Sequence, residues 1–194
     1  MNLVDRVKKI LITPKSEWAV IDTESQTVAS LYTQYVMILA AIPVVASFIG
    51  FSVVGYTGFG VAYRVPMGAG LASMVLGYVL SLASVYVIAL VIDALAPNFG
   101  GEKNFIQSLK VAAFFPTASW ICGIFSILPA LAILGVIGGL YSLYLLYLGL
   151  GPLKKVPEEK TIGYTVVVVI VAIVLMVVIS TVAALITPSP MRGF

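Results

Sequence analysis

No charged residue occurs between Ser25 and Tyr63, and similar charge-free apolar stretches make up most of the rest of the chain. A helix of roughly 20 apolar residues crosses about 30 Å of hydrocarbon, where each backbone polar group needs a partner within the protein. Hydrophobic residues account for 61% of the sequence and charged residues for only 10%, outside the range usual for soluble domains. The sequence therefore predicts an all-α polytopic membrane protein.

Five transmembrane helices are predicted from these stretches. Their expected ranges are 32–54, 66–92, 111–127, 130–150 and 162–186. The third and fourth are separated only by an uncharged break, so they form either a tight hairpin of two full spans, which we favour, or two shorter re-entrant helices. The expected organisation is a cytoplasmic segment at 1–31, a five-helix membrane domain at 32–187 and a short external tail at 188–194.

Lysine and arginine collect in alternate connections of this arrangement. Nine of the eleven fall in the segments before the first, third and fifth helices: Arg6, Lys8, Lys9, Lys15, Lys103, Lys110, Lys154, Lys155 and Lys160. Arg64 and Arg192 fall in the other connections. Because positive residues accumulate in short cytoplasmic loops, this distribution predicts an N-terminus inside and a C-terminus outside the cell.

The N-terminal segment is predicted to form an amphipathic helix that lies in the headgroup region. One face of this helix is apolar and consists of Leu3, Val7, Ile10 and Leu11. The charged residues lie mostly on the other faces, and Trp18 is placed to anchor the following segment at the same depth. This segment acts either as a membrane-surface anchor, which we favour, or as a docking surface for a cytosolic partner.

The residues that most enzymes and metal sites require are scarce. Histidine is absent and Cys122 is the single cysteine, which excludes a Cys/His zinc site, a haem with His ligation and a Ser-His-Asp triad within this chain. An intramolecular disulfide is excluded as well. We predict no enzymatic activity, metal or cofactor, and no nucleic-acid partner, because no dense basic stripe is present.

Asp93 ends a long apolar run and is therefore a candidate site. An acidic residue at membrane depth indicates function by default, for example in a proton or cation relay. Asp93 lies at the cytoplasmic end of its predicted span, however, where we favour a solvated position or an ion pair with Lys103 or Lys110. Its span has no second acidic residue at helical spacing, so an intramembrane enzyme ranks lowest.

The connection at 96–105 places Gly100 and Gly101 beside charged and aromatic residues. It either folds back, with Phe105 in the interface and Lys110 snorkelling towards the headgroups, or makes an ordinary tight turn into the next helix. The candidate binding residues on the cytoplasmic face are Arg6, Lys8, Lys9, Asp93, Glu102, Lys103 and Lys110.

Small residues recur at helix-packing spacing in two of the predicted spans. They are Ala69, Ser73, Gly77 and Ser81 in the second span, and Gly135 and Gly139 in the fourth. Such faces allow close approach of helices. We expect them to pack within the monomer, with self-association into a homo-oligomer as the alternative.

Two segments carry a family resemblance. They are Leu11-Ile12-Thr13-Pro14-Lys15-Ser16-Glu17-Trp18 and the run from Phe99-Gly100-Gly101-Glu102-Lys103 to Val111, with Pro116 after it. Together with the five spans they resemble the prokaryotic branch of the Yip1 family over nearly the whole chain. The resemblance implies a five-helix integral membrane protein with a cytosolic N-terminus.

Eukaryotic members of that family are associated with Rab-type GTPases and with vesicle budding or fusion. This chain lacks their long cytosolic N-terminal domain and their Asp-Leu-Tyr-Gly-Pro type of motif, so the GTPase association is not carried over. For the short prokaryotic members the family name implies an architecture and no settled biochemical activity.

Two functions from different classes are consistent with these features. The leading hypothesis is a non-enzymatic scaffold or adaptor in the cell membrane of a prokaryote, which engages lipids or a protein partner through its cytoplasmic face. The alternative is a small transporter or channel, oligomeric through its small-residue faces, that uses Asp93 and helices kinked at Pro43 and Pro116.

Overall fold

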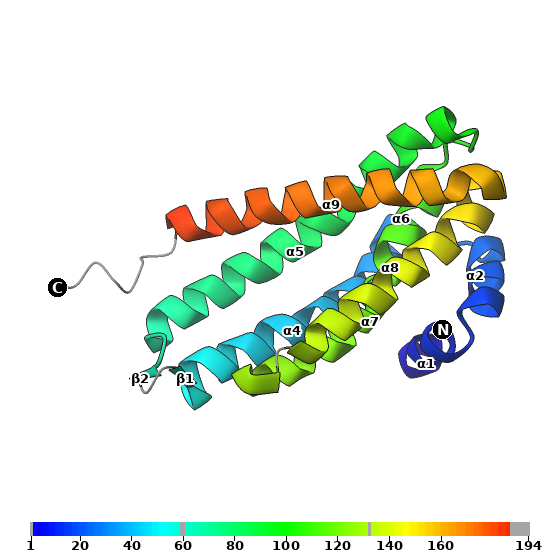
Figure 1. Cartoon of the computed structure of the whole chain (residues 1–194). Coiled ribbons are helices and arrows are strands. Elements are labelled where there is room, and N and C mark those ends of the chain that lie inside the picture. Colours follow the sequence, from blue (N-terminus) through cyan, green and yellow to red (C-terminus); the bar gives the residue numbers. More distant parts are fainter. Residues whose placement is uncertain (1, 59–60, 132, 187–194) are drawn as a thin grey trace.

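The computed structural model describes residues 2–58, 61–131 and 133–186, and within them the chain forms a bundle of long helices (Figure 1). Five helical segments are long and apolar enough to cross a membrane: Val28–Val54, Met67–Phe99, Phe105–Ile127, Ile133–Lys154 and Glu158–Thr181. This confirms the predicted all-α polytopic fold, and the third and fourth segments both have full membrane length. The predicted tail at 188–194, which includes Arg192, lies outside the described residues.

Two short helices precede the bundle, α1 (Leu3–Ile12) and α2 (Pro14–Thr23). The Asn2 side chain caps α1 by accepting a hydrogen bond from the backbone N–H of Val4 at 3.0 Å, and Pro14 occupies the first turn of α2. The structure places α1 and α2 beside α7 and α8 (Figure 1). The N-terminal segment is therefore part of the folded bundle.

The predicted amphipathic helix is present, but its apolar face contacts protein. Ile10 is fully buried, and the other three residues of that face pack against the same core cluster. Trp18, expected to be an interfacial anchor, is also fully buried. Val4 and Ile12 remain 57% and 76% exposed. The sequence identified an apolar face correctly, but apolar periodicity does not distinguish a lipid contact from a protein contact.

The first span is a continuous helical segment with two wider turns. It comprises α3 (Val28–Leu31), the π-helical η1 (Tyr32–Val36), α4 (Met37–Phe48) and the π-helical η2 (Ile49–Val54). Thr27 and Ser30 begin it with a reciprocal capping box. Pro43 lies inside α4 without ending it.

A small hairpin that the sequence analysis did not predict connects the first two spans. Its strands are β1 (Tyr56–Gly58) and β2 (Val61–Tyr63), paired antiparallel. The second span follows as α5 (Met67–Leu95) and the 3-10 helix η3 (Ala96–Phe99). Gly100 ends η3 in the left-handed region, with φ of +77°, a conformation that glycine adopts without strain.

The third span is divided at the predicted proline. It consists of α6 (Phe105–Phe114), α7 (Thr117–Cys122) and the 3-10 helix η4 (Gly123–Ile127). The Asn104 side chain caps α6 by accepting from the backbone N–H of Gln107 at 3.2 Å, so the helix begins before the predicted position 111. The chain continues through η5 (Pro129–Leu131), α8 (Ile133–Lys154) and α9 (Glu158–Ile186).

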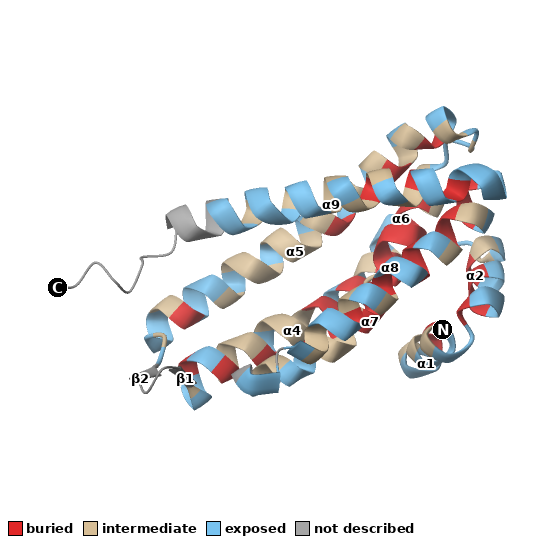
Figure 2. Cartoon of the chain, in the orientation of Figure 1, coloured by how far each residue is buried: buried red, intermediate tan, exposed pale blue. Residues whose placement is uncertain are grey.

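Apart from Arg64, the charged residues in the described part of the chain gather at one end of this bundle. That end, here called the charged end, contains α1, α2, the start of α6 and the α8–α9 connection, and the opposite end, here called the apolar end, contains the β1–β2 hairpin (Figure 1). Buried residues concentrate towards the charged end, whereas most of α9 is exposed (Figure 2). The location of the charged end on the cytoplasmic side remains a prediction from the positions of lysine and arginine.

Candidate functional site

A buried arginine joins the two N-terminal helices and contacts one aromatic ring of the bundle. The side chain of Arg6, in α1, is 2% exposed and forms ion pairs with Glu17 of α2 and with Glu24 after it. Its guanidinium carbon lies 5.7 Å from the centre of the Phe114 ring of α6. A buried charge requires partners of this kind. We call Arg6, Glu17 and Glu24 the Arg6 cluster.

Arg6 was named as a candidate residue for lipid or partner binding at the cytoplasmic face, but its side chain is buried. Folding brings two carboxylates over its guanidinium and removes the side chain from solvent. Lys8 and Lys9 on the same helix, which were also named as candidate binding residues, are exposed.

Lys110 is buried as well and holds the end of α2. Its ammonium donates to the carbonyl oxygens of Ile21 at 2.8 Å and Glu24 at 2.7 Å. The last carbonyls of a helix lack partners within it and carry partial negative charge, so a cation there is favourable. Gln107 adds a hydrogen bond to the Asp22 carboxylate at 2.8 Å. Of the two alternatives for this connection, snorkelling of Lys110 is therefore not observed, because α2 supplies these acceptors inside the protein.

Asp93 joins three helices at the charged end. Its Oδ1 atom accepts from the ammonium of Lys154 at 2.9 Å, the hydroxyl of Ser108 at 3.1 Å and the backbone N–H of Asn104 at 2.8 Å. Lys154 is fully buried and also donates to the carbonyl of Asn104 at 3.1 Å. These contacts connect the ends of α5 and α8 with the start of α6.

The ion pair predicted for Asp93 exists, but with a different lysine. Neither Lys103 nor Lys110 is its partner, because Lys103 is exposed and Lys110 binds α2. Lys154 was counted only as a topology signal in the sequence, because the predicted fourth span ended at residue 150, whereas α8 continues to Lys154. The way α8 packs in the bundle determines that Lys154, and neither Lys103 nor Lys110, reaches Asp93.

Six lysines remain exposed around these buried contacts. They are Lys8, Lys9, Lys15, Lys103, Lys155 and Lys160, and we call them the exposed lysines. Lys155 pairs with Glu102 at 2.9 Å, and this carboxylate raises the pKa of Lys155. Both side chains are about two-thirds exposed, so the pair contributes little to stability.

The predicted small-residue faces are mostly not used for packing within the described chain. A Cβ atom added at Gly77 or Gly135 would have no neighbour within 4 Å, and at Gly139 only the Ser119 hydroxyl would be as near as 4.0 Å. Ser73 is exposed, and Ala69 and Ser81 are half-buried. The expectation that these faces mediate close packing in the monomer is wrong for Gly77 and Gly135, because each of them faces open space.

In α8, close packing occurs at two other glycines instead. A Cβ atom at Gly138 would lie 2.6 Å from Cβ of Cys122, and one at Gly149 would lie 2.8 Å from Cζ2 of Trp18. Adjacent helical positions differ by about 100° in direction, so the spacing of Gly135 and Gly139 selected the wrong face of α8.

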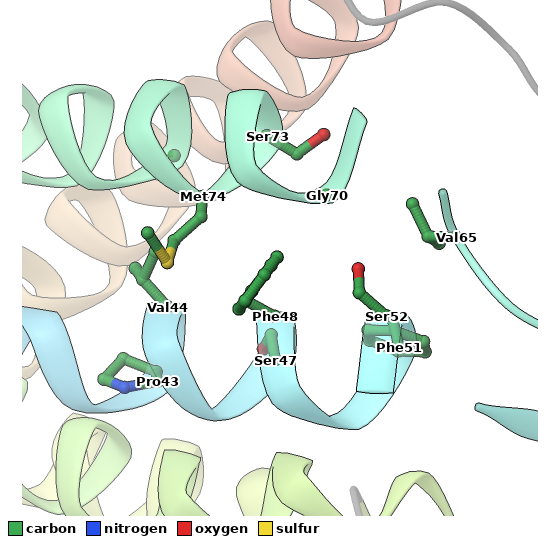
Figure 3. A pocket seen from close by; sticks show the side chains of 11 residues that line it. Pro43, Val44, Ser47, Phe48, Phe51, Ser52, Val65, Gly70, Ser73 and Met74 are labelled. Atoms are coloured by element: carbon green, nitrogen blue, oxygen red, sulfur yellow. The ribbon is translucent and has the colours of Figure 1, made fainter. Parts of the chain in front are cut away.

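Of the cavities in the described bundle, two lie towards opposite ends of it. The first has a volume of about 350 Å³, lies between α4–η2 and α5, and is mostly apolar (Figure 3). Ser52 is one of its lining residues, and the Ser52 hydroxyl is buried without a hydrogen-bond partner among the described residues. The second, at the charged end, has a volume of about 380 Å³ and polar walls that include Glu24 and Gln26.

The arrangement defines an integral, multi-pass, α-helical membrane protein. A family model described as the Yip1 domain matches residues 8–179, and the chain therefore belongs to the Yip1 family. This confirms the resemblance found in the sequence.

Similar proteins include inner membrane protein YohC of Escherichia coli strain K12 and the protein of the same name in E. coli O6:H1. Each is 32% identical over 117 residues, which cover 60% of this chain and 60% of the relative. No solved structure gave a significant match.

Proposed function

We propose that this protein is a non-enzymatic scaffold or adaptor of the Yip1 type, which engages membrane lipids or a protein partner through its charged end. Its location would be the inner membrane, as the name of the E. coli relatives indicates. The separation between buried and exposed charges at the charged end is the observation that carries this proposal.

The buried charges serve the fold. The Arg6 cluster, Lys110 and the Asp93–Lys154 pair connect α1 and α2 with α5, α6 and α8. The exposed lysines surround these buried contacts and can approach headgroup phosphates or an acidic protein surface. A lysine close to an anionic membrane surface contributes about 1 kcal/mol to binding.

No group of three His, Cys, Asp or Glu side chains in the described ranges could hold a metal ion. The surroundings of Asp93 favour a scaffold over a transporter, because its Oδ1 atom accepts three hydrogen bonds that join helix ends.

The test compares lipid retention in nanodiscs that contain equal amounts of phosphatidylglycerol and phosphatidylcholine. One variant replaces Lys8, Lys9 and Lys15 with Gln, and a second replaces Lys103, Lys155 and Lys160 with Gln. Native mass spectrometry of the released protein counts the lipids of each class that remain bound. The matched control is Arg64→Gln, which removes an exposed charge near the apolar end.

The wild type should retain phosphatidylglycerol over phosphatidylcholine, and at least one lysine variant should lose this preference. High salt should weaken the preference of the wild type, because exposed charges are screened. If both lysine variants retain lipids as the wild type does and also capture the same proteins from solubilised membranes, the proposal is wrong.

A further inference from the structure

The N-terminal helix α1 lies on the side of the bundle, well away from the end of α8. The hydroxyl of Tyr141 in α8 donates to the carbonyl oxygen of Leu11 at 2.7 Å. Along the axis of α8, Tyr141 precedes Lys154, the last residue of the helix, by about 20 Å. The α1 helix also contacts α7 (Figure 1). On this side of the molecule the N-terminal segment therefore reaches far below the Asp93–Lys154 pair.

Exposed charges accompany α1 to this depth. Lys8 and Lys9 lie within one helical turn of Leu11 and are exposed, as is Asp5 on the same helix. Ionised side chains are costly in hydrocarbon, so α1 belongs at the level of the lipid headgroups. Ile12, next to Leu11, is 76% exposed, as is usual for an apolar residue inserted between headgroups. One headgroup layer on this side therefore lies at the level of α1.

The turn between the third and fourth spans marks the opposite boundary of this side. The 3-10 helix η4 ends before Leu128, whose backbone is extended, and η5 forms a short 3-10 turn before α8 begins at Ile133. Leu128 and Leu131 are exposed. Irregular backbone that faces lipid does not occur within hydrocarbon, because its polar groups need partners. The turn therefore belongs at the second headgroup layer, and a tilt of the whole molecule that submerged it is disfavoured.

The apolar surface between these two boundaries is short. Exposed aliphatic residues of α8 extend over about 15 Å of helix before the exposed Tyr144, a residue type typical of the interface. We call these residues the α8 face: Ile133, Val136, Ile137, Leu140 and Leu143. On α5 the exposed large apolar residues extend from Met67 to Leu90, about 35 Å of helix. A hydrocarbon core of about 30 Å matches α5 and exceeds the α8 face.

We infer that the bilayer is thinner against the α8 face than against α5, and that the α8 face binds phospholipids with short acyl chains. The α1 helix holds one headgroup layer of this thin region, and the turn before α8 holds the other. A short apolar surface thins the adjacent bilayer at a modest cost per ångström. The inference goes beyond the proposed function, because it concerns the hydrocarbon beside α8 and not the headgroup or partner that the exposed lysines bind.

Depth measurements with spin labels test the inference on the full-length protein in nanodiscs of dioleoylphosphatidylcholine. Single cysteines are introduced into a Cys122→Ser background at four exposed positions. Lys9→Cys and Ile133→Cys mark the two boundaries of the α8 face, and Met67→Cys and Leu90→Cys mark the ends of the apolar surface of α5. The accessibility of each label to oxygen and to a water-soluble nickel chelate gives its depth. The α5 pair is the matched control, since it reports on the same protein in the same bilayer.

All four labels should lie at headgroup depth. The depths of the two α5 labels should differ by about 30 Å, and those of the Lys9→Cys and Ile133→Cys labels by no more than about 20 Å. Hydrocarbon depth for the label at Lys9 or Ile133 would overturn the inference, because the molecule would then be tilted in a bilayer of even thickness. Ile12→Cys replaces Lys9→Cys if that variant does not fold.

A further label asks whether lipid is the neighbour of the α8 face. Ile137→Cys, in the middle of the face, should be accessible to oxygen and protected from the nickel chelate, as expected for a position in hydrocarbon. Protection from both reagents would overturn the inference, because a second copy of the chain would then cover the face.

The preference for short chains is measured in nanodiscs that contain equal amounts of dimyristoleoyl- and dierucoyl-phosphatidylcholine. Native mass spectrometry should find the shorter lipid retained about threefold over the longer one. The double variant Tyr144→Leu and Tyr147→Leu lengthens the apolar surface of α8 to about 21 Å and should reduce this preference. Tyr86→Leu, at an exposed tyrosine of α5, is the control and should leave it unchanged.

Equal retention of the two lipids by the wild type would overturn the inference, as would a preference that the double variant leaves intact. Both lipids carry the same headgroup, so neither measurement depends on the charge of the lipid. Loss of phosphatidylglycerol preference in the lysine variants tests the proposed function separately, and the two ideas can fail independently.

Discussion

The charged end differs from the halves of α5 and α9 that lie nearer the apolar end in the contacts that hold the helices in place. Helices at the charged end are joined by buried ion pairs and hydrogen bonds, including those of Arg6 and Asp93. In the most apolar window of α9 only 11% of residues are buried, compared with 44% for the third span. Specific polar contacts therefore fix one end, whereas lipid is the expected neighbour for much of the rest.

This difference follows from the solvent each region meets. Apolar side chains gain little by packing on one another in a bilayer, because the lipid is as apolar as they are. Ile173 and Met176 of α9 are accordingly left 53% and 63% exposed. At the charged end, ordered contacts have to come from polar groups that find one another, and each buried charge has a partner there.

The replacement Arg6→Met tests most directly whether buried ion pairs stabilise the charged end. It leaves Glu17 buried and without its ion-pair partner, so we expect the free energy of unfolding to fall by about 3–5 kcal/mol. Unfolding in mixed micelles, followed by circular dichroism, measures the change. Lys8→Met is the control, since Lys8 is exposed on the same helix. Equal stability of the two variants would show that the Arg6 cluster does not hold α1 and α2.

Adding one methyl group separates the tightly packed region from the open one. Gly149→Ala would push a Cβ atom against the buried Trp18 ring, at a cost of about 1–3 kcal/mol. Gly135→Ala on the same helix meets open space and should be neutral or stabilising by up to about 1 kcal/mol. The same unfolding assay compares the two variants. If Gly135→Ala destabilises the protein as much, the face near Gly135 packs against something, and a homo-oligomer becomes the leading explanation.

The smallest effect is expected at the apolar cavity. The Ser52 hydroxyl is buried without a partner in the described structure, and Ser52→Ala removes that unsatisfied group. We expect the protein to gain up to about 1 kcal/mol in stability. Ser47→Ala, which alters the same cavity at another position, is the comparison. A clear loss of stability on replacing Ser52 would show that its hydroxyl has a partner, such as a bound molecule.

The sequence predicted the parts of this molecule that depend on one segment at a time. The five spans follow from runs of apolar residues, and the break near Pro116 follows from a missing backbone donor. The amphipathic pattern of residues 3–12 also predicted a helix correctly. These properties are local, so no knowledge of neighbouring helices was needed.

The pairing of charges could not be predicted in the same way. Arg6 finds Glu17 and Glu24 only because α1 and α2 fold back on one another, and Asp93 finds Lys154 only because α8 ends beside α5. Each pair depends on a three-dimensional arrangement that the spacing along the chain does not encode. The cavity at the charged end was missed for this reason, since Phe114 meets Gln26 only in the folded protein.

The Arg6 cluster joins α1 to α2, and Arg6 contacts Phe114 of the bundle, so we expect the ordered docking of this segment to depend on Arg6. Hydrogen exchange of residues 3–23, measured by mass spectrometry in nanodiscs for the wild type, Arg6→Met and Lys8→Met, tests it most directly. The account predicts slow exchange in the wild type and in Lys8→Met, and fast exchange in Arg6→Met. Fast exchange of this segment in the wild type, or the same exchange in all three proteins, would contradict it.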